Sequence, residues 1–169
     1  MKIADIYSND VTDGIGVCVS VWFQGCNRHC KGCQNPSTWD PNGGKDITIE
    51  ELIQTTIEHI SANGIQRNLS ILGGEPLAYY NINATAQLIT AVKAHYPNIK
   101  VFLWTGFTYD ELLTFNLESI NTILNNIDVL IDGPFILEKR DISLQLRGSS
   151  NQRILVKNSN NKFEQVNKI

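Results

Sequence analysis

The sequence has 169 residues, of which 42% are hydrophobic and 18% are charged, and its formal net charge is −3 at pH 7. This composition excludes collagen-like, disordered and disulfide-packed chains, and the length predicts a single domain over residues 1–169. Because the chain is acidic and lacks a run of Lys or Arg, we expect no binding to nucleic acid or to an anionic membrane. No stretch approaches the roughly 18 apolar residues of a membrane span and no apolar leader is found, so a cytoplasmic protein is expected.

Strand-like and helix-like patterns alternate along the chain. The predicted strands are 16–23, 69–72, 99–104, 127–131 and 153–156, and the predicted helices lie at 49–63, at 83–96 and from 109 onward. Two of these helices begin at capping boxes, one formed by Thr48 with Glu51 and the other by Thr108 with Glu111. The Asn- and Lys-rich tail from about Asn158 is expected to be solvated and loosely ordered.

Strands separated by helices imply a mainly parallel sheet. A closed eight-stranded barrel typically needs about 250 residues, so the predicted fold class is α/β with a partial, open parallel β/α barrel. Ligands of such sheets bind at the carboxyl ends of the strands. Four unusual segments each follow a predicted strand and are therefore expected on one rim: the cysteine cluster at 26–33, Gly73-Gly74-Glu75-Pro76, Thr105-Gly106 and Asp132-Gly133.

Three of the four cysteines lie within eight residues of sequence. Cys26, Cys30 and Cys33 have the spacing Cys-x-x-x-Cys-x-x-Cys, and a reducing compartment argues against a disulfide framework. Three thiolates on one loop suit a soft metal or an iron-sulfur cluster, since Arg28, Lys31 and the metal itself would favour the deprotonated thiols.

Structural zinc is the alternative interpretation of the cysteine cluster. Zinc normally takes four protein ligands, and Cys18 or His29 could supply the fourth. Cys18 lies in the middle of a predicted strand, however, where a packed small hydrophobic residue is expected. A cluster with three cysteine ligands leaves one iron open for chemistry, which favours the iron-sulfur interpretation.

The cysteine motif after the first strand, together with Gly73-Gly74-Glu75-Pro76 after the second, resembles the radical S-adenosylmethionine superfamily. Within it, five longer strings resemble the activating proteins of anaerobic ribonucleoside-triphosphate reductases. These strings are Trp22-Phe23-Gln24-Gly25-Cys26, Asn35-Pro36-Ser37-Thr38-Trp39, Trp104-Thr105-Gly106, Asp128-Val129-Leu130-Ile131-Asp132-Gly133 and Arg147-Gly148-Ser149-Ser150-Asn151-Gln152-Arg153. The resemblance covers about residues 13–153, nearly the whole chain.

The resemblance implies a cofactor set and a reaction. Cys26, Cys30 and Cys33 would hold three irons of a 4Fe-4S cluster, and S-adenosylmethionine would chelate the fourth. One electron from a low-potential donor would cleave S-adenosylmethionine to methionine and a 5′-deoxyadenosyl radical. This radical would take a hydrogen atom from a glycine of the partner protein, an anaerobic ribonucleoside-triphosphate reductase, and leave a glycyl radical.

The resemblance also implies contacts to S-adenosylmethionine. Gly73 and Gly74 would let the backbone approach its methionine part, where a Cβ would be in the way, and Glu75 would accept a hydrogen bond from its ammonium group. Asp132 would bind the ribose hydroxyls, although an Asp before Gly at a strand end is equally typical of a turn.

The adenine contacts implied by the resemblance come from the end of the cysteine motif. The backbone of Gly32 and Gln34, on either side of Cys33, would lie near the adenine. Many related activases have an aromatic residue where this chain has Gly32, so another side chain must cover the ring. Trp104 and Trp39 are candidates, with burial in the core as the alternative for both.

Two other functions are compatible with the sequence. One is a radical S-adenosylmethionine enzyme that acts on a small molecule, although a chain this short has few residues left to close a small-substrate pocket. The other, from a different class, is a zinc-stabilised binding module, for which loss of Cys26 would unfold the protein.

Overall fold

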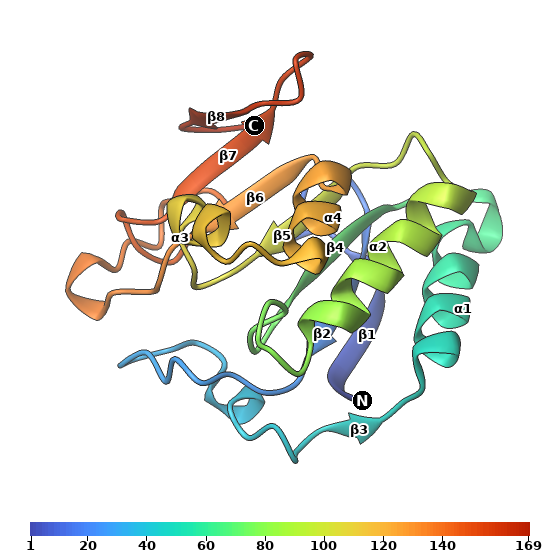
Figure 1. Ribbon diagram of the computed structural model, residues 1–169, viewed down its shortest axis with the longest axis horizontal. Helices are drawn as coiled ribbons and strands as arrows, with labels where there is room; N and C mark the ends of the chain where they lie inside the picture. Colours follow the sequence, from blue (N-terminus) through green and yellow to red (C-terminus); the bar gives the residue numbers. More distant parts are fainter.

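The computed structural model describes residues 1–169, and its central feature is an eight-stranded mixed sheet with the order β3-β1-β2-β4-β5-β6-β7-β8 (Figure 1). The four middle strands are parallel to one another: β2 (Cys18–Phe23), β4 (Asn68–Gly73), β5 (Val101–Trp104) and β6 (Val129–Asp132). The outer strands pair antiparallel: β1 (Lys2–Asp10), β3 (Lys45–Asp46), β7 (Arg153–Lys157) and β8 (Phe163–Val166). The predicted α/β class is confirmed, but the sheet is mixed rather than mainly parallel.

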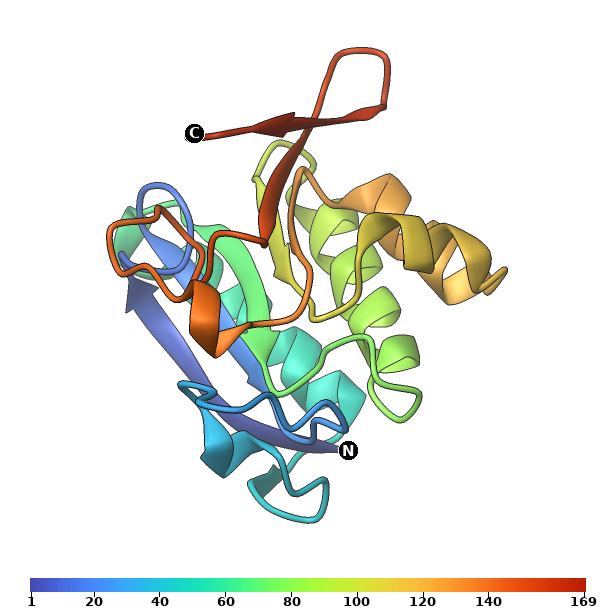
Figure 2. The same cartoon turned by 90° about the vertical axis from the view of Figure 1, so that its left-hand side faces the viewer.

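Four α-helices lie on one face of this sheet (Figures 1 and 2). They are α1 (Ile49–Ile60), α2 (Ile82–His95), α3 (Tyr109–Thr114) and α4 (Glu118–Asn126), and short 3-10 turns occupy Pro36–Thr38, Ala62–Gly64 and Leu137–Lys139. Both predicted capping boxes are confirmed at the starts of α1 and α3. The helix expected from 109 onward is interrupted before α4, because Asn116 adopts a left-handed conformation with φ 46°.

The hydrophobic core lies between the sheet and the helices, where Phe23, Ile71 and Leu103 meet Leu52 and Leu88. Each of these side chains is fully buried. Burial of this apolar surface is the main force that holds the helices on the sheet.

A smaller apolar cluster packs on the opposite face of the sheet. It contains Cys18, Phe102, Val129, Ile131 and Ile154. Cys18 is 1% exposed there, so the prediction that it is a packed small hydrophobic residue is confirmed.

Three outer strands, β1, β3 and β8, were missed by the sequence pattern. In β1 only Ile3 is fully buried, and β3 consists of two exposed residues, so neither strand contains a continuous apolar run. In the tail expected to be solvated, Phe163–Val166 forms β8 against β7. Phe163 explains this strand, since its ring packs against Tyr109, with 5.3 Å between the ring centroids.

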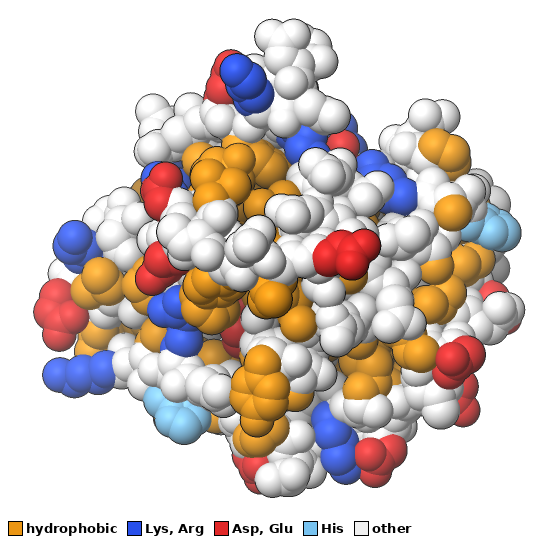
Figure 3. Space-filling view, viewed as in Figure 1, with side chains coloured by type: hydrophobic (Ala, Val, Ile, Leu, Met, Phe, Trp, Pro, Cys, Tyr) orange, Lys and Arg blue, Asp and Glu red, His pale blue; other side chains and the backbone are white.

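The surface that carries the helices mixes positive and negative side chains, with hydrophobic patches between them (Figure 3). No helix combines the length and the apolar character needed to cross a bilayer.

Candidate cofactor site lined by three cysteines

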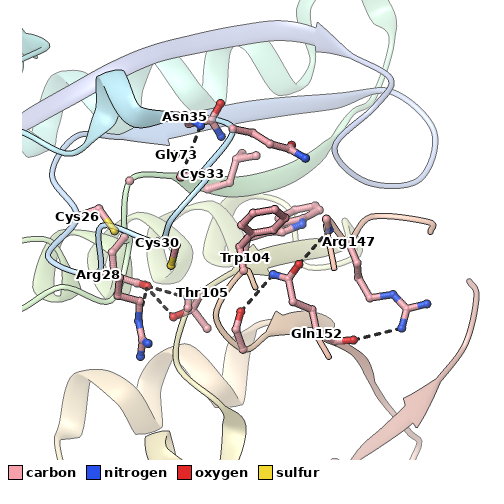
Figure 4. A pocket seen from close by; sticks show the side chains of 18 of the residues that line it. Cys26, Arg28, Cys30, Cys33, Asn35, Gly73, Trp104, Thr105, Arg147 and Gln152 are labelled. Atoms are coloured by element: carbon pink, nitrogen blue, oxygen red, sulfur yellow. Dashed lines mark hydrogen bonds and ion pairs between the residues drawn. The ribbon is translucent and has the colours of Figure 1, made fainter. Parts of the chain in front are cut away.

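A cavity of about 380 Å³ lies where the four parallel strands end. Its walls include Cys26, Cys30 and Cys33 after β2, Gly73, Gly74 and Glu75 after β4, Thr105 and Gly106 after β5, and Gly133 after β6. The prediction that four unusual segments share one rim is therefore confirmed. Of the segment Asp132-Gly133, only Gly133 lines the cavity. Cys26 and Cys30 lie toward one end of the cavity, and Trp104 and Gln152 lie toward the other (Figure 4).

Backbone amides make hydrogen bonds at the start and at the end of the cysteine loop. The amide of Cys26 donates to the carbonyl of Trp39 at 3.0 Å, and the amide of Cys33 donates to the carbonyl of Cys30 at 3.0 Å. The amide of Asn35 donates to the sulfur of Cys33 at 3.4 Å. No three candidate ligands are grouped closely enough to hold a single metal ion.

The thiols of this loop are half-buried rather than fully exposed. Burial raises the pKa of Cys26, and the negative charge of Glu75 raises this pKa further. The backbone amides of Arg28 and His29 lower the pKa in part. Cys26 is therefore a protonated thiol at neutral pH in the absence of a metal. A bound metal must displace that proton, as is usual for thiolate ligands.

Glu75 is buried, and both of its carboxylate oxygens already accept hydrogen bonds. Oε1 accepts from the hydroxyl of Thr105 at 2.7 Å and from the amide of Leu77 at 3.0 Å, and Oε2 accepts from the amide of Gly106 at 2.8 Å. Burial raises the pKa of Glu75, and these hydrogen bonds and the charge of Arg28 lower it in part. Glu75 therefore joins the loops after β4 and β5, and little of its hydrogen-bonding capacity is left for a ligand.

Gly73 and Gly74 line the cavity, and the structure gives a reason for these glycines that differs from the expected approach of a ligand. A Cβ on Gly73 would lie 2.5 Å from the carbonyl oxygen of Phe23, and one on Gly74 would collide with the carbonyl of Gly25 and lie 2.9 Å from that of Thr38. The missing side chains thus make room for the neighbouring polypeptide backbone. Any contact of these residues with a ligand must come from their own backbone.

Only some of the residues expected near an adenine lie at the cavity. Cys33 and Gln34 line the cavity, whereas Gly32 does not, because its Cα faces Leu137, whose Cδ1 would lie 2.8 Å from an added Cβ.

Of the two tryptophans named as candidates to cover the adenine, only Trp104 lines the cavity. Its indole nitrogen donates to the carbonyl of Leu146 at 2.9 Å, which fixes the ring in the wall. Trp39 instead lies against the ring of His29, 4.8 Å away.

Asp132 does not line the cavity, and its carboxylate is used inside the protein. The residue is fully buried. Its oxygens accept from the guanidinium of Arg153 and, at 2.7 Å, from the amide of Tyr109 at the start of α3. Asp132 thus matches the alternative interpretation, a structural residue at the end of a strand, and its position does not support the ribose contact expected for it.

Sequence reasoning missed the long wall that follows β6. Phe135, Leu144, Leu146 and Gly148 line the cavity together with Gln152. Gln152 holds this wall, since its Oε1 accepts from the amide of Gly148 at 2.9 Å and its Nε2 donates to the carbonyl of Gly133 at 3.1 Å. The only sequence signal for this wall was the unusual polar string that begins at Arg147.

Asp13 is a further cavity residue, and the sequence did not predict it as part of the site. It lies in the connection between β1 and β2. Burial and the neighbouring charge of Asp10 raise the pKa of Asp13 to about 7. The cavity therefore contains a carboxyl group that titrates near neutral pH.

The class of protein to which this chain belongs follows from its match to a known family. The family model of the 4Fe-4S single cluster domain matches residues 12–155. The chain is therefore a 4Fe-4S single cluster domain protein, and the cysteine loop lies inside the matched region.

Relatives then define the family within this class. An anaerobic ribonucleoside-triphosphate reductase-activating protein of Vibrio cholerae serotype O1 is 39% identical over 155 residues, which cover 91% of this chain and 97% of the relative. Proteins of the same name from Escherichia coli K12 and Enterobacteria phage T4 are 33% and 34% identical, and the alignments cover 90% and 91% of this chain and 96% and 93% of the relatives. The chain belongs to the family of anaerobic ribonucleoside-triphosphate reductase-activating proteins.

Proposed function

We propose that this protein is an activase that generates a glycyl radical on an anaerobic ribonucleoside-triphosphate reductase, with a 4Fe-4S cluster and S-adenosylmethionine as cofactors. The observation that carries the proposal is the convergence of Cys26, Cys30 and Cys33 with the loop of Gly73 to Glu75 in one cavity. The names of the relatives supply the partner.

The donor set suits such a cluster. Three thiols from one short loop face a common cavity, and the backbone amide of Asn35 already donates to the sulfur of Cys33, as is usual around cluster-bound thiolates. In a four-iron cluster each cysteine binds a different iron, so the three sulfurs need not converge on one point. Cys26, Cys30 and Cys33 would be the ligands.

The cluster would supply one electron that cleaves S-adenosylmethionine, and the 5′-deoxyadenosyl radical would then abstract a hydrogen atom from a glycine of the reductase. The protein contributes binding, orientation and exclusion of water. The backbone at Gly73 and Gly74 would bind the methionine part, and Gln34 would lie near the adenine. Trp104, with its indole anchored to Leu146, would form an apolar wall beside the adenosyl group.

A protein substrate requires an accessible site. The cavity is bounded on one side by the parallel strand ends and on the other by the loop after β6, and we propose that the reductase supplies the remaining cover. An open barrel of the radical S-adenosylmethionine type, contained in a single domain, is part of this proposal, as is a low-potential electron donor.

The proposal is tested by anaerobic reconstitution with iron and sulfide, reduction with dithionite and addition of S-adenosylmethionine, with 5′-deoxyadenosine as the measured product. Cys18→Ala is the matched control, because Cys18 is packed away from the cavity in the small apolar cluster. We expect the Cys18→Ala variant to bind iron and form 5′-deoxyadenosine, and a Cys30→Ala variant to lose the product while keeping its fold.

Two results would contradict the proposal. A wild-type protein that takes up zinc but no iron and forms no 5′-deoxyadenosine would favour the zinc-stabilised module. Rapid formation of 5′-deoxyadenosine that no reductase accelerates, with no glycyl radical, would favour an enzyme that acts on a small molecule.

A further inference from the structure

Arg28 lies inside the cysteine loop, between Cys26 and Cys30, and its side chain is three-quarters buried (24% exposed). It lines the cysteine cavity and also a second, mainly apolar cavity of about 480 Å³ between the start of α2 and the α3–α4 connection. Figure 4 shows it beside both cysteines. Arg28 therefore forms part of the partition between the two cavities.

The side chain of Arg28 is anchored on the corner between β5 and α3. Its guanidinium carbon lies 4.2 Å from the ring centroid of Phe107, a distance typical of a cation–π contact. Its Nε lies 3.9 Å from Oε2 of Glu75, and a terminal nitrogen lies 3.9 Å from Oε2 of Glu111. Gly106 leaves the space for this arrangement, because a Cβ there would collide with the Arg28 side chain.

Two other side-chain contacts involve this part of the loop, one of which is the packing of the His29 ring 4.8 Å from the Trp39 ring. The hydroxyl of Tyr80 donates to Asn27 at 3.1 Å. Arg28 is two residues from Cys26 and two from Cys30 along the chain, so movement of its backbone would move both cysteines. Arg28 thus connects Cys26 through its backbone with Phe107 through its side chain.

We infer that Arg28 is a positioning residue that locks the cysteine loop onto Phe107 and thereby controls how firmly the cluster is retained. The inference rests on the proposed function in one respect, namely that the loop binds iron and sulfide. A loop held in place before loading loses less conformational entropy on binding and releases its ligands more slowly.

The test is a double-mutant cycle between Arg28 and Phe107 on reconstituted protein, with the rate of iron release to a chelator as the readout. Arg28→Gln and Phe107→Leu should each speed release by roughly 3- to 30-fold, the range of a partly desolvated cation–π contact. The double variant should release iron no faster than the faster single variant, since both changes remove one contact. Arg28→Lys keeps the positive charge but not the planar stack on Phe107. Its rate of iron release should therefore lie between those of the wild type and Arg28→Gln.

Lys31→Gln is the matched control. Lys31 lies exposed in the same loop and outside both cavities, so this change removes one positive charge near the cysteines without removing an anchor. We expect its iron release to equal that of the wild type. The thermal unfolding midpoint of each apo-protein shows whether a variant has lost its fold instead.

Other outcomes would overturn the inference. If the effects of Arg28→Gln and Phe107→Leu multiply in the double variant, the two residues act independently. If Lys31→Gln speeds release as much as Arg28→Gln, charge and not anchoring controls retention. Either result leaves the activase proposal intact, whereas a wild-type protein that binds no iron overturns both.

Discussion

The carboxylate of Glu75 accepts a 2.7 Å hydrogen bond from the hydroxyl of Thr105, so the loops that follow β4 and β5 meet through one buried acid. Two backbone amides, those of Leu77 and Gly106, complete the arrangement. The Gly-Gly-Glu-Pro motif therefore shapes the rim of the cavity through contacts within the protein.

A Glu75→Gln substitution should destabilise the fold. The amide has only one acceptor oxygen, so its NH₂ group must face a backbone N–H that the carboxylate now satisfies. We expect a loss of about 1–3 kcal/mol in the free energy of unfolding, measured with denaturant. Glu138→Gln, at an exposed site, should change it by less than about 0.5 kcal/mol, and equal effects of the two variants would contradict the assigned role.

Asp13 should make stability depend on pH. Its pKa is about 7 in the folded protein against an ordinary 3.8, so between these values the folded state binds a proton that the unfolded state has released. Stability should therefore fall as the pH rises through this window. An Asp13→Asn variant should show a flatter profile and gain stability relative to the wild type from pH 4 to pH 7, and parallel profiles would exclude the raised pKa.

Asp132 should matter for stability and not for the binding of S-adenosylmethionine. Removal of its carboxylate in Asp132→Ala leaves Arg153 without its buried partner and the start of α3 without its acceptor, at a cost of about 3 kcal/mol. Asp132→Asn should cost less and bind S-adenosylmethionine as the wild type does in calorimetry of the loaded protein. Selective loss of that binding, with stability unchanged, would restore the ribose role.

Trp104 should hold the wall after β6 through its indole nitrogen. A Trp104→Phe substitution keeps the apolar ring but removes the hydrogen bond to the carbonyl of Leu146. We expect a loss of about 1 kcal/mol in stability and faster hydrogen exchange of the loop that contains Leu146. Unchanged exchange in this loop would show that the wall is held by other contacts, such as those of Gln152.

The sequence predicted those parts of the fold that depend on local patterns. The strands that became β2, β4, β5 and β6 are apolar runs that end in unusual motifs, and parallel pairing brings such ends together, which is why the cavity rim could be anticipated. The capping boxes are equally local, because Thr48 and Glu51 are only three residues apart. Outer strands such as β1 and β8 lack a continuous apolar pattern and are defined by the strands they pair with.

The features of the site that the sequence did not predict depend on contacts between residues far apart in the chain. The carboxylate of Asp132 accepts hydrogen bonds from Arg153, which lies 21 residues further along the chain. The need for Gly73 comes from the backbone of Phe23 on the neighbouring strand. Spacing within a motif indicates which chemistry a residue supports, but a partner far along the chain decides whether its side chain is free to do it.

The most direct measurement is electron paramagnetic resonance of the reconstituted, reduced protein mixed anaerobically with an anaerobic ribonucleoside-triphosphate reductase and S-adenosylmethionine. We predict a glycyl radical signal on the reductase that requires all three components and is absent with the Cys30→Ala variant. A reductase that stays free of radical, although the same protein holds its cluster and cleaves S-adenosylmethionine in its presence, would contradict the proposed function.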